Sequence, residues 1–280
     1  MSTSHTPADR SVVERTLGVL GAFDTAHVSL TVSQISKRSR LPVATTYRIV
    51  SKLVSWGALE RAEDNKYTIG LRLWEVALLA PRHGDLRAAA VPAMFQLRSM
   101  THCAVLLSAR DGTEGICLES VSGTARPLHR SWSRGHRFPL HATACGRVLL
   151  AAADTTVHEE LYRGDLRTYT KRTVHTPTVL RDLVEHTRRQ GYAVSDGELL
   201  DGVVEIAAPI HDGDGAVLGA IGLITVGTAT ARVPDAVGPL LAAARRISRS
   251  LADRRTPRGG AVPPPRRASS RAQRPQGACA

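Results

Sequence analysis

The sequence has few aromatic residues, few cysteines and no long apolar run. Aromatic residues make up 4% of its 280 residues, and the cysteines are scattered, with no CxxC pair: Cys103, Cys117, Cys145 and Cys279. This pattern indicates neither a disulfide framework nor a zinc ribbon, so we expect buried thiols. No apolar run reaches the roughly 20 residues that a membrane helix requires, and residues 1–10 lack the apolar core of a signal peptide. We therefore expect a cytoplasmic protein that does not contact a membrane.

Common catalytic and cofactor motifs are also missing. The chain has no GxSxG elbow, no P-loop and no GxGxxG fingerprint. Four potential zinc ligands share one stretch, at spacings that fit no common zinc pattern: His129, His136, His141 and Cys145. An acidic cluster suited to acid–base chemistry or to ligand contact lies further along: Asp196, Glu198 and Asp201. We predict no catalytic residue, no metal and no cofactor, and a metal-dependent enzyme is the least favoured alternative.

The chain does have the composition of a globular core and an excess of positive charge. Hydrophobic residues make up 42% of it and charged residues 22%. The formal net charge of +12 makes a polyanion such as nucleic acid the first partner to consider. Residues 254–280 contribute seven arginines and no acid, so the rest of the chain is only mildly basic. Such a tail raises non-specific affinity for nucleic acid, and a solvated tail without function is the open alternative.

Changes in composition divide the chain into two domains and a linker. Residues 1–8 and 254–280 are rich in Pro, Ser, Thr, Gly or Arg without apolar periodicity, which predicts disorder at both ends. Residues 9–70 carry short helical patterns and a hairpin, whereas residues 85–253 alternate strands and helices. The linker, residues 71–84, holds a short helix that its Pro-Arg-His-Gly sequence is expected to break.

Three helical patterns and a hairpin fill residues 9–70. The first helix is expected over residues 11–24, with one buried stripe: Val13, Leu17, Leu20 and Phe23. Thr31 and Gln34 fit a capping box that starts a second helix of about two turns. Pro42 suits the first turn of a third helix that Gly57 ends. Two short strands, 58–62 and 66–69, then make a wing, which completes a winged helix-turn-helix.

The third helix has two contrasting faces. One face is expected to be buried: Thr46, Ile49, Val50 and Leu53. The other carries only small residues and cations, so it can approach DNA closely, with Arg48 and Thr45 at base edges. Between Asp24 and Glu60 the chain has five cations and no acid. We predict that the DNA-binding residues are Thr31, Lys37, Arg38, Val43, Ala44, Thr45, Tyr47, Arg48 and Lys52.

Many residues in this region match one known module in order. The matches are Ser11, Arg15 and Leu17, then Leu41, Pro42, Thr45, Arg48 and Leu53, then Tyr67, Gly70 and Leu73. With these residues the N-terminal domain resembles the DNA-binding module of the IclR family of bacterial transcriptional regulators. The resemblance implies a regulator that recognises operator DNA.

The C-terminal domain reads as an α+β fold. Asp111-Gly112 joins two strand-like runs, 102–110 and 113–121, into a hairpin. An alanine-rich helix lies within residues 135–153, and a second helix begins at Thr176-Pro177. Three further strands and a final helix follow: 192–195, 203–211, 216–226 and 234–253. This order predicts a mainly antiparallel sheet with helices on one side.

Two segments of this domain are similar to the effector-binding domain of the IclR family, whose fold resembles GAF-type sensors. They are GHRFPLHATACGRVLLA (135–151) and GYAVSDGELLDGVVEIAAPIHDGDGAVLGAIGLI (191–224). The resemblance implies an effector pocket at Ala144, Cys145, Ser195, Val203, Glu205, Gly222 and Ile224. Four positions depart from the family pattern: Arg147 replaces a usual Lys, Glu205 a common Cys, and Ser195 and Gly222 stand where a carboxylate and a Ser can occur.

Glu205 is the departure with the largest chemical consequence. A carboxylate inside a pocket must be paired, so Glu205 should meet a nearby Arg or bind a cation or hydroxyl donor of the ligand. The alternative is that Glu205 faces solvent at a strand edge, because strand alternation alone does not assign its face.

Together these observations predict a transcriptional regulator whose operator binding a small organic effector modulates. Winged modules read short half-sites, so a homodimer or homotetramer is expected, paired through the linker and the first helices. The sequence leaves open whether the regulator represses or activates. The alternative function is non-specific nucleic-acid binding through the basic surface and tail.

Overall fold

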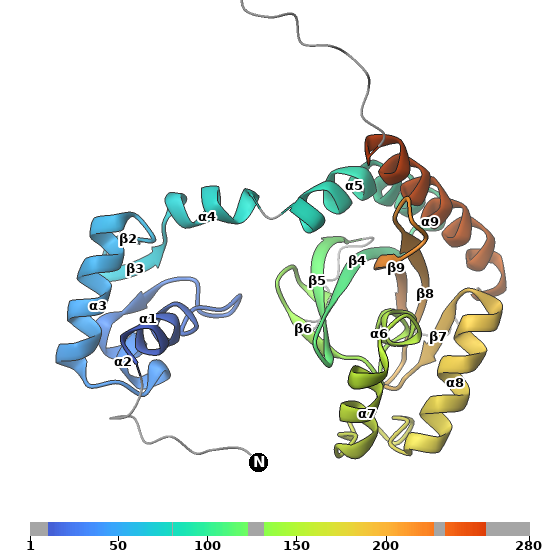
Figure 1. Cartoon of the computed structure of the whole chain (residues 1–280), viewed down its shortest axis with the longest axis horizontal. Coiled ribbons are helices and arrows are strands. Elements are labelled where there is room, and N and C mark those ends of the chain that lie inside the picture. The colour runs from blue at the N-terminus through green and yellow to red at the C-terminus, as the bar shows by residue number, and fades with distance from the viewer. Residues whose placement is uncertain (1–10, 80, 123–131, 227–232, 256–280) are drawn as a thin grey trace, which may run out of the picture.

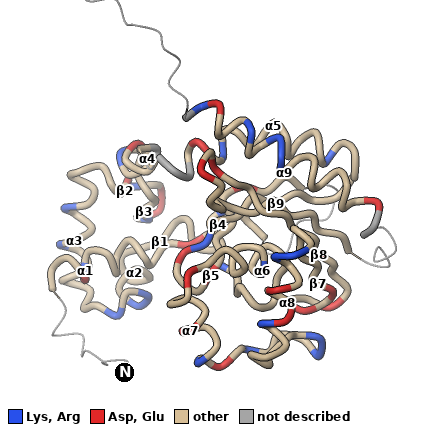
Figure 2. Tube along the Cα trace, turned by 45° about the vertical axis from the view of Figure 1, so that its right-hand side comes forward, with Lys and Arg blue, Asp and Glu red and all other residues tan. Residues whose placement is uncertain are grey.

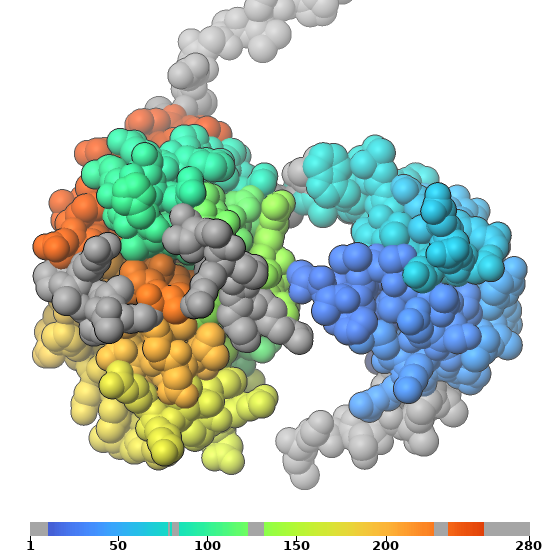
Figure 3. Space-filling view, turned by 180° about the vertical axis from the view of Figure 1, so that it is seen from behind, coloured from blue at the N-terminus to red at the C-terminus, as the bar shows by residue number. Residues whose placement is uncertain are grey.

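The computed structural model describes residues 11–79, 81–122, 132–226 and 233–255. The expected disorder of residues 1–8, most of the arginine-rich tail and His129 lie outside these ranges. The N-terminal domain and the C-terminal domain form two separate masses with separate hydrophobic cores (Figures 1 and 3). Within the described ranges, no helix has the length and apolar character needed to cross a membrane.

The N-terminal domain is a winged helix-turn-helix, as predicted. Its elements are α1 (Val12–Leu20), β1 (Leu30–Thr31), α2 (Val32–Ser39), α3 (Val43–Trp56), β2 (Leu59–Arg61) and β3 (Lys66–Ile69). The strands form an antiparallel sheet in the order β1-β3-β2. Val19, Ile35 and Val50, one from each helix, are fully buried together with Leu59. Three short helices thus share one small core against the wing.

Local signals set the ends of these helices. Thr31 accepts a hydrogen bond from the Gln34 N–H, and the Gln34 side chain accepts one from the Thr31 N–H, which confirms the predicted capping box. Gly57 ends α3 at φ 87°, a left-handed conformation that glycine adopts without strain. Pro42 is the N-cap of α3, one residue before its first helical residue.

The predicted buried stripe of the first helix is wrong in part. Val13 and Leu17 are 66% and 59% exposed, and Val19 is the residue of α1 that is fully buried. The helix also ends at Leu20, with Gly21 as its cap, so Phe23 lies beyond it. The periodicity identifies an apolar face correctly, but part of that face is left uncovered by the rest of this domain.

The linker region contains two helices, and the break between them lies before Pro81 and not at the Pro-Arg-His-Gly sequence as expected. α4 covers Leu71–Leu78, and α5 covers Pro81–Thr101. The Pro-Arg-His-Gly sequence therefore forms the first turn of α5 instead of an interruption, because a proline at the start of a helix loses no hydrogen bond. Pro92 lies inside α5 without ending it.

A six-stranded antiparallel sheet forms the centre of the C-terminal domain. Its strands are β4 (Ala104–Asp111), β5 (Glu114–Val121), β6 (Arg137–Pro139), β7 (Ala193–Asp196), β8 (Val203–His211) and β9 (Val217–Val226). They lie in the order β6-β5-β4-β9-β8-β7. The two hairpins predicted from Asp111-Gly112 and from residues 212–215 are present as β4–β5 and β8–β9. β6 was not foreseen from the sequence.

Helices cover both faces of this sheet, so the prediction that they lie on one side is wrong (Figure 1). α5 and α9 (Val233–Arg255) pack on one face, while α6 (Ala144–Ala151) and α8 (Pro177–Gln190) pack on the other. An additional helix, α7 (Thr155–Arg163), follows α6. Consecutive residues of β4 and β8 are buried on alternating faces, which requires a layer on each side.

Candidate functional site

The outer face of α3 is an exposed, basic surface, as the sequence predicts. Thr46 and Val50 are fully buried, whereas the residues expected to face DNA are exposed or half-buried: Val43, Ala44, Thr45, Tyr47, Arg48 and Lys52. Lys37 on α2 is also exposed. Figure 2 shows the positive charges of α2 and α3 along these two helices, without acidic residues between them. The helix pair therefore presents one basic surface.

The structure adds Arg15 to this surface. A shallow groove of about 370 Å³ runs between α1 and α3, and its lining includes Arg15, Thr45, Arg48 and Lys52. Three cations thus lie around one groove. Helical spacing within α3 could not predict that a residue of α1 lies beside this face. The one indication in the sequence was that Arg15 matches the family pattern.

Arg38 and Thr31 have structural partners of their own. The Arg38 guanidinium donates to Asp24 Oδ2 at 2.6 Å and to the Ala22 carbonyl at 2.5 Å. Although partial burial opposes ionisation, hydrogen bonds from His27 and Ala26 and the charges of His27 and Arg38 lower the pKa of Asp24 to about 2. Arg38 therefore holds the turn after α1, which leaves it less free for a phosphate than Lys37.

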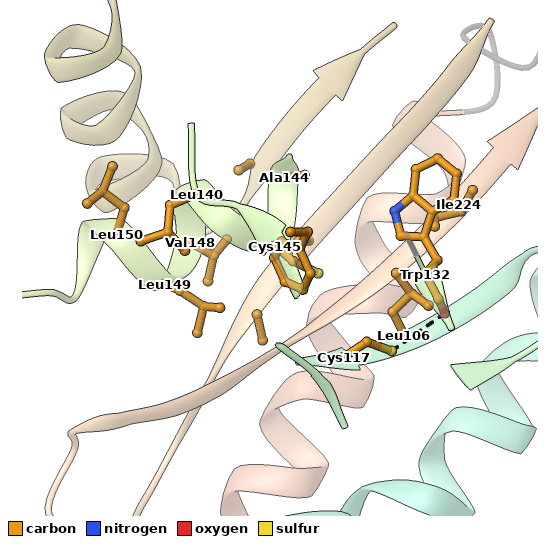
Figure 4. Close-up of a cluster of buried hydrophobic side chains, with 14 of the residues drawn as sticks. Leu106, Cys117, Trp132, Leu140, Ala144, Cys145, Val148, Leu149, Leu150 and Ile224 are labelled. Atoms are coloured by element: carbon orange, nitrogen blue, oxygen red, sulfur yellow. Dashed lines mark hydrogen bonds between the residues drawn. The ribbon is translucent and has the colours of Figure 1, made fainter. Parts of the chain in front are cut away.

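The predicted effector residues lie together on the face of the sheet that α6 covers. Ala144 and Cys145 are the first residues of α6, and Figure 4 shows them within a cluster of buried apolar side chains. The strand residues stand in register: Ser195 pairs with Glu205, and Glu205 with Ile224. All seven predicted residues are buried: Ala144, Cys145, Ser195, Val203, Glu205, Gly222 and Ile224.

Glu205 points inward, and its side chain meets the start of α6. The residue is 3% exposed, so the alternative in which it faces solvent is wrong. Glu205 Oε1 accepts the Cys145 N–H at 2.9 Å, and Oε2 accepts the Ala144 N–H at 3.3 Å. Burial raises the pKa of Glu205, while the Cys145 thiol, these two N–H groups and the Arg147 charge oppose the rise. The partner of Glu205 is therefore a helix N-terminus, where sequence reasoning expected an arginine or a ligand.

Cys145 and Gly222 are packed around the same carboxyl group. Burial and the nearby Glu205 raise the pKa of the Cys145 thiol well above its usual value, so the thiol is a hydrogen-bond donor. A Cβ on Gly222 would lie 2.6 Å from Cys145 Sγ and 3.5 Å from Glu205 Oε1. A serine at position 222 therefore requires the Cys145 thiol to move, so Gly222 fits the packing of this thiol.

Arg147 on α6 and Glu198 in the loop after β7 form a buried ion pair. Arg147 Nη2 donates to Glu198 Oε1, and both side chains are at most one-tenth exposed. Arg147 Nε and Glu198 Oε2 are buried without a hydrogen-bond partner among the described residues. Two residues of the predicted acidic cluster are thus paired with arginines, because Asp196 pairs with Arg172 as well.

The three candidate zinc ligands that the structure describes do not come together. His141 Nε2 lies 2.9 Å from the Arg167 carbonyl oxygen, and burial lowers the pKa of His141. His136 contacts Thr25, and Cys145 faces Glu205. Across the described ranges, no group of three His, Cys, Asp or Glu side chains is arranged to hold a metal ion.

Comparison with known proteins matches both domains. The family model for the IclR helix-turn-helix domain matches residues 12–63, and that for the bacterial transcriptional regulator IclR C-terminal domain matches residues 80–249. The Pca regulon regulatory protein of Pseudomonas putida is 32% identical over 235 residues, covering 83% of this chain and 80% of that protein. The transcriptional regulator XynR of Escherichia coli is 31% identical, covering 80% and 88%.

Among solved structures, an IclR homologue from Microbacterium hydrocarbonoxydans in complex with 4-hydroxybenzoate aligns with a TM-score of 0.82. It is 31% identical, and the alignment covers 87% of this chain and 100% of that chain. The matched family models span the winged helix-turn-helix and the sheet domain, and the relatives are regulators rather than enzymes. The chain therefore belongs to the IclR family and is a DNA-binding transcriptional regulator with an effector-binding C-terminal domain.

Proposed function

We propose that α3 lies in the major groove of operator DNA, with Arg48 and Thr45 at base edges and Lys37 and Lys52 at phosphates. The observation that carries this proposal is the exposed basic face of α3, which has no acidic neighbour on α2 or α3. Small residues such as Ala44 let the helix approach the bases, and Arg48 has the fork of donors that guanine accepts. Val43 and Tyr47 lie near the groove, and Thr31 and Arg38 at its edge.

We also propose that the active species is a homodimer or a pair of dimers, acting on cytoplasmic DNA. Exposed apolar side chains on α1 and α4 support a paired state, including Leu17 and Trp74, which are more than half exposed. Exposed apolar faces of this kind favour contact with a second copy of the chain. Two paired modules reach the specificity that one short half-site does not supply.

A small organic effector in the C-terminal domain would change the relative placement of the two winged modules. It acts only through its different affinity for the two arrangements. Small or apolar residues at the predicted site favour a ligand of modest size: Ala144, Val203, Gly222 and Ile224. The 4-hydroxybenzoate bound by the similar Microbacterium protein provides a first probe.

The test is fluorescence anisotropy of the full chain on DNA from its own upstream region and on a scrambled duplex of equal length. We expect the native duplex to bind at least about 10³-fold more tightly at ~150 mM salt. Equal affinity for both duplexes, collapsing as salt rises, would instead support non-specific binding through the basic surface.

Truncation of residues 254–280 separates the tail from this activity. We expect the shortened chain to show weaker, less salt-dependent binding to scrambled DNA while keeping its preference for the native duplex. Loss of the preference itself would make the tail part of the specific interface.

A further inference from the structure

We propose that the Glu205 carboxyl group fills the anion-binding N-terminus of α6, so that the effector site accepts neutral hydroxyl- or amide-bearing molecules and excludes carboxylates. The inference rests on the proposed role of this site in effector binding. It concerns the charge of the ligand, which family membership does not determine for this chain.

Glu205 already occupies the N-terminus of α6. The N–H groups at the start of a helix lack partners inside the helix and carry partial positive charge, so they attract anions. Here two of these groups, on Ala144 and Cys145, already donate to the two oxygens of one side chain, Glu205. Thr143 Oγ1 accepts the next one, from Gly146, at 3.0 Å. A ligand carboxylate would have to displace the Glu205 carboxyl group to use these donors.

The charged side chains around this helix also disfavour an anionic ligand. Among the described residues, Arg147 is the cation that acts on both carboxyl groups: it forms its ion pair with Glu198 and lowers the pKa of Glu205 only by proximity. A ligand carboxylate would add a third carboxyl group to a buried region in which Arg147 is the one arginine paired with them among the described residues. Coulomb repulsion between like charges is strong where water is excluded. The described surroundings therefore oppose an anionic ligand as well as occupying its donors.

Polar groups around α6 keep unused donors and acceptors among the described residues. Arg147 Nε offers a donor and Glu198 Oε2 an acceptor, both buried and unpartnered among the described residues. The Ser108 hydroxyl is fully buried beside the Cys145 thiol and meets no other polar partner in the described chain. A hydroxyl or amide group can both donate and accept, whereas a carboxylate can only accept. This mixture of donors and acceptors therefore suits a ligand hydroxyl or amide better than a carboxylate.

Replacing Glu205 by alanine should uncover a binding site for a small carboxylate. We propose measuring melting temperatures of the full chain and of Glu205→Ala in acetate and in acetamide, which is similar in size but neutral. Acetate should stabilise Glu205→Ala by about 3 °C or more at a concentration roughly tenfold above its Kd. It should not stabilise the wild type beyond the acetamide control. Glu160→Ala, which removes an exposed glutamate of α7, serves as the matched variant and should behave like the wild type.

Equal stabilisation by acetate and acetamide, or equal stabilisation of the wild type, would overturn the proposal. If Glu205→Ala does not fold in plain buffer, it is refolded in acetate and in acetamide. Recovery in acetate alone supports an anion site at α6, and no recovery in acetate contradicts it.

The choice of ligand is then tested with a charged and a neutral probe of the same shape. We expect the affinity ratio of 4-hydroxybenzoate to 4-hydroxybenzamide to rise at least tenfold from the wild type to Glu205→Ala. A wild type that prefers 4-hydroxybenzoate would overturn the proposal. Neither ligand measurement involves DNA, so failure of operator binding in the anisotropy assay would refute the proposed function separately.

Discussion

At the scale of single residues, Arg48 is expected to have the largest effect on sequence recognition. Its side chain is exposed on α3 and lines the groove shared with Arg15 and Lys52. Arg48→Ala should weaken binding to the native operator by about 1–3 kcal/mol and relax the preference at one base pair. Anisotropy titrations on single-substitution duplexes provide the measurement. Arg163→Ala, which removes an exposed arginine of α7, is the control for net charge.

Equal weakening of Arg48→Ala on all duplexes would move this residue from base contact to phosphate contact. The same titrations on Lys52→Ala should show uniform weakening and a salt slope that is lower by about one.

Asp24 is expected to make the stability of the N-terminal domain depend on acid. Its pKa is lowered from 3.8 to about 2, so its ionised form stabilises the folded state. The contribution is present above pH 4 and is lost as the pH falls toward 2. Because Asp24 is partly exposed, we expect less than about 1 kcal/mol at pH 7. Urea unfolding of Asp24→Asn and of the wild type should differ at pH 7 and converge at low pH; a constant difference would contradict this role.

At the scale of elements, the Arg147–Glu198 pair should hold the acidic loop against α6. Glu198→Ala leaves a buried guanidinium without its partner, which typically costs about 3–5 kcal/mol. The double variant Arg147→Met, Glu198→Leu removes both charges and should regain most of that loss. The measurement is the urea denaturation midpoint of the wild type, of Glu198→Ala and of the double variant. A double variant as unstable as Glu198→Ala would show that the pair itself supplies the stability.

The elements also show which features a sequence can predict. Thr31 with Gln34, Gly57 and Asp111-Gly112 act within a few residues, so caps and hairpins were predicted closely. Val13 and Leu17 were assigned to the core because periodicity shows an apolar face without showing what covers it. The helix layers on both faces of the sheet depend on contacts between distant segments, which local patterns do not contain.

In the candidate sites, too, local features could be predicted from the sequence and contacts between distant segments could not. The basic face of α3 lies on one helix and could be predicted from spacing, whereas Arg15 joins it from α1. For Glu205 the sequence showed that a carboxyl group needed a partner. It could not show that the partner is a helix that begins 61 residues earlier in the chain.

At the scale of the whole molecule, the exposed apolar residues of α1 and α4 should pair two chains. Burying one leucine side chain contributes about 1.5–3 kcal/mol, and a two-fold interface buries it twice. Leu17→Glu should therefore raise the dimer dissociation constant at least tenfold in sedimentation experiments. Val28→Glu is the control, since Val28 is also more than half exposed but lies outside α1 and α4. Unchanged association of Leu17→Glu would place the pairing surface elsewhere.

The central claim, that paired winged modules read DNA through α3, is tested most directly by hydroxyl-radical footprinting on the upstream DNA. The account predicts two protected half-sites related by two-fold symmetry, with centres separated by about 10–10.5 base pairs or a multiple of this spacing. Protection should be lost with Arg48→Ala at concentrations where Arg163→Ala retains it. A single unsymmetrical footprint, or protection that Arg48→Ala leaves intact, would contradict the claim.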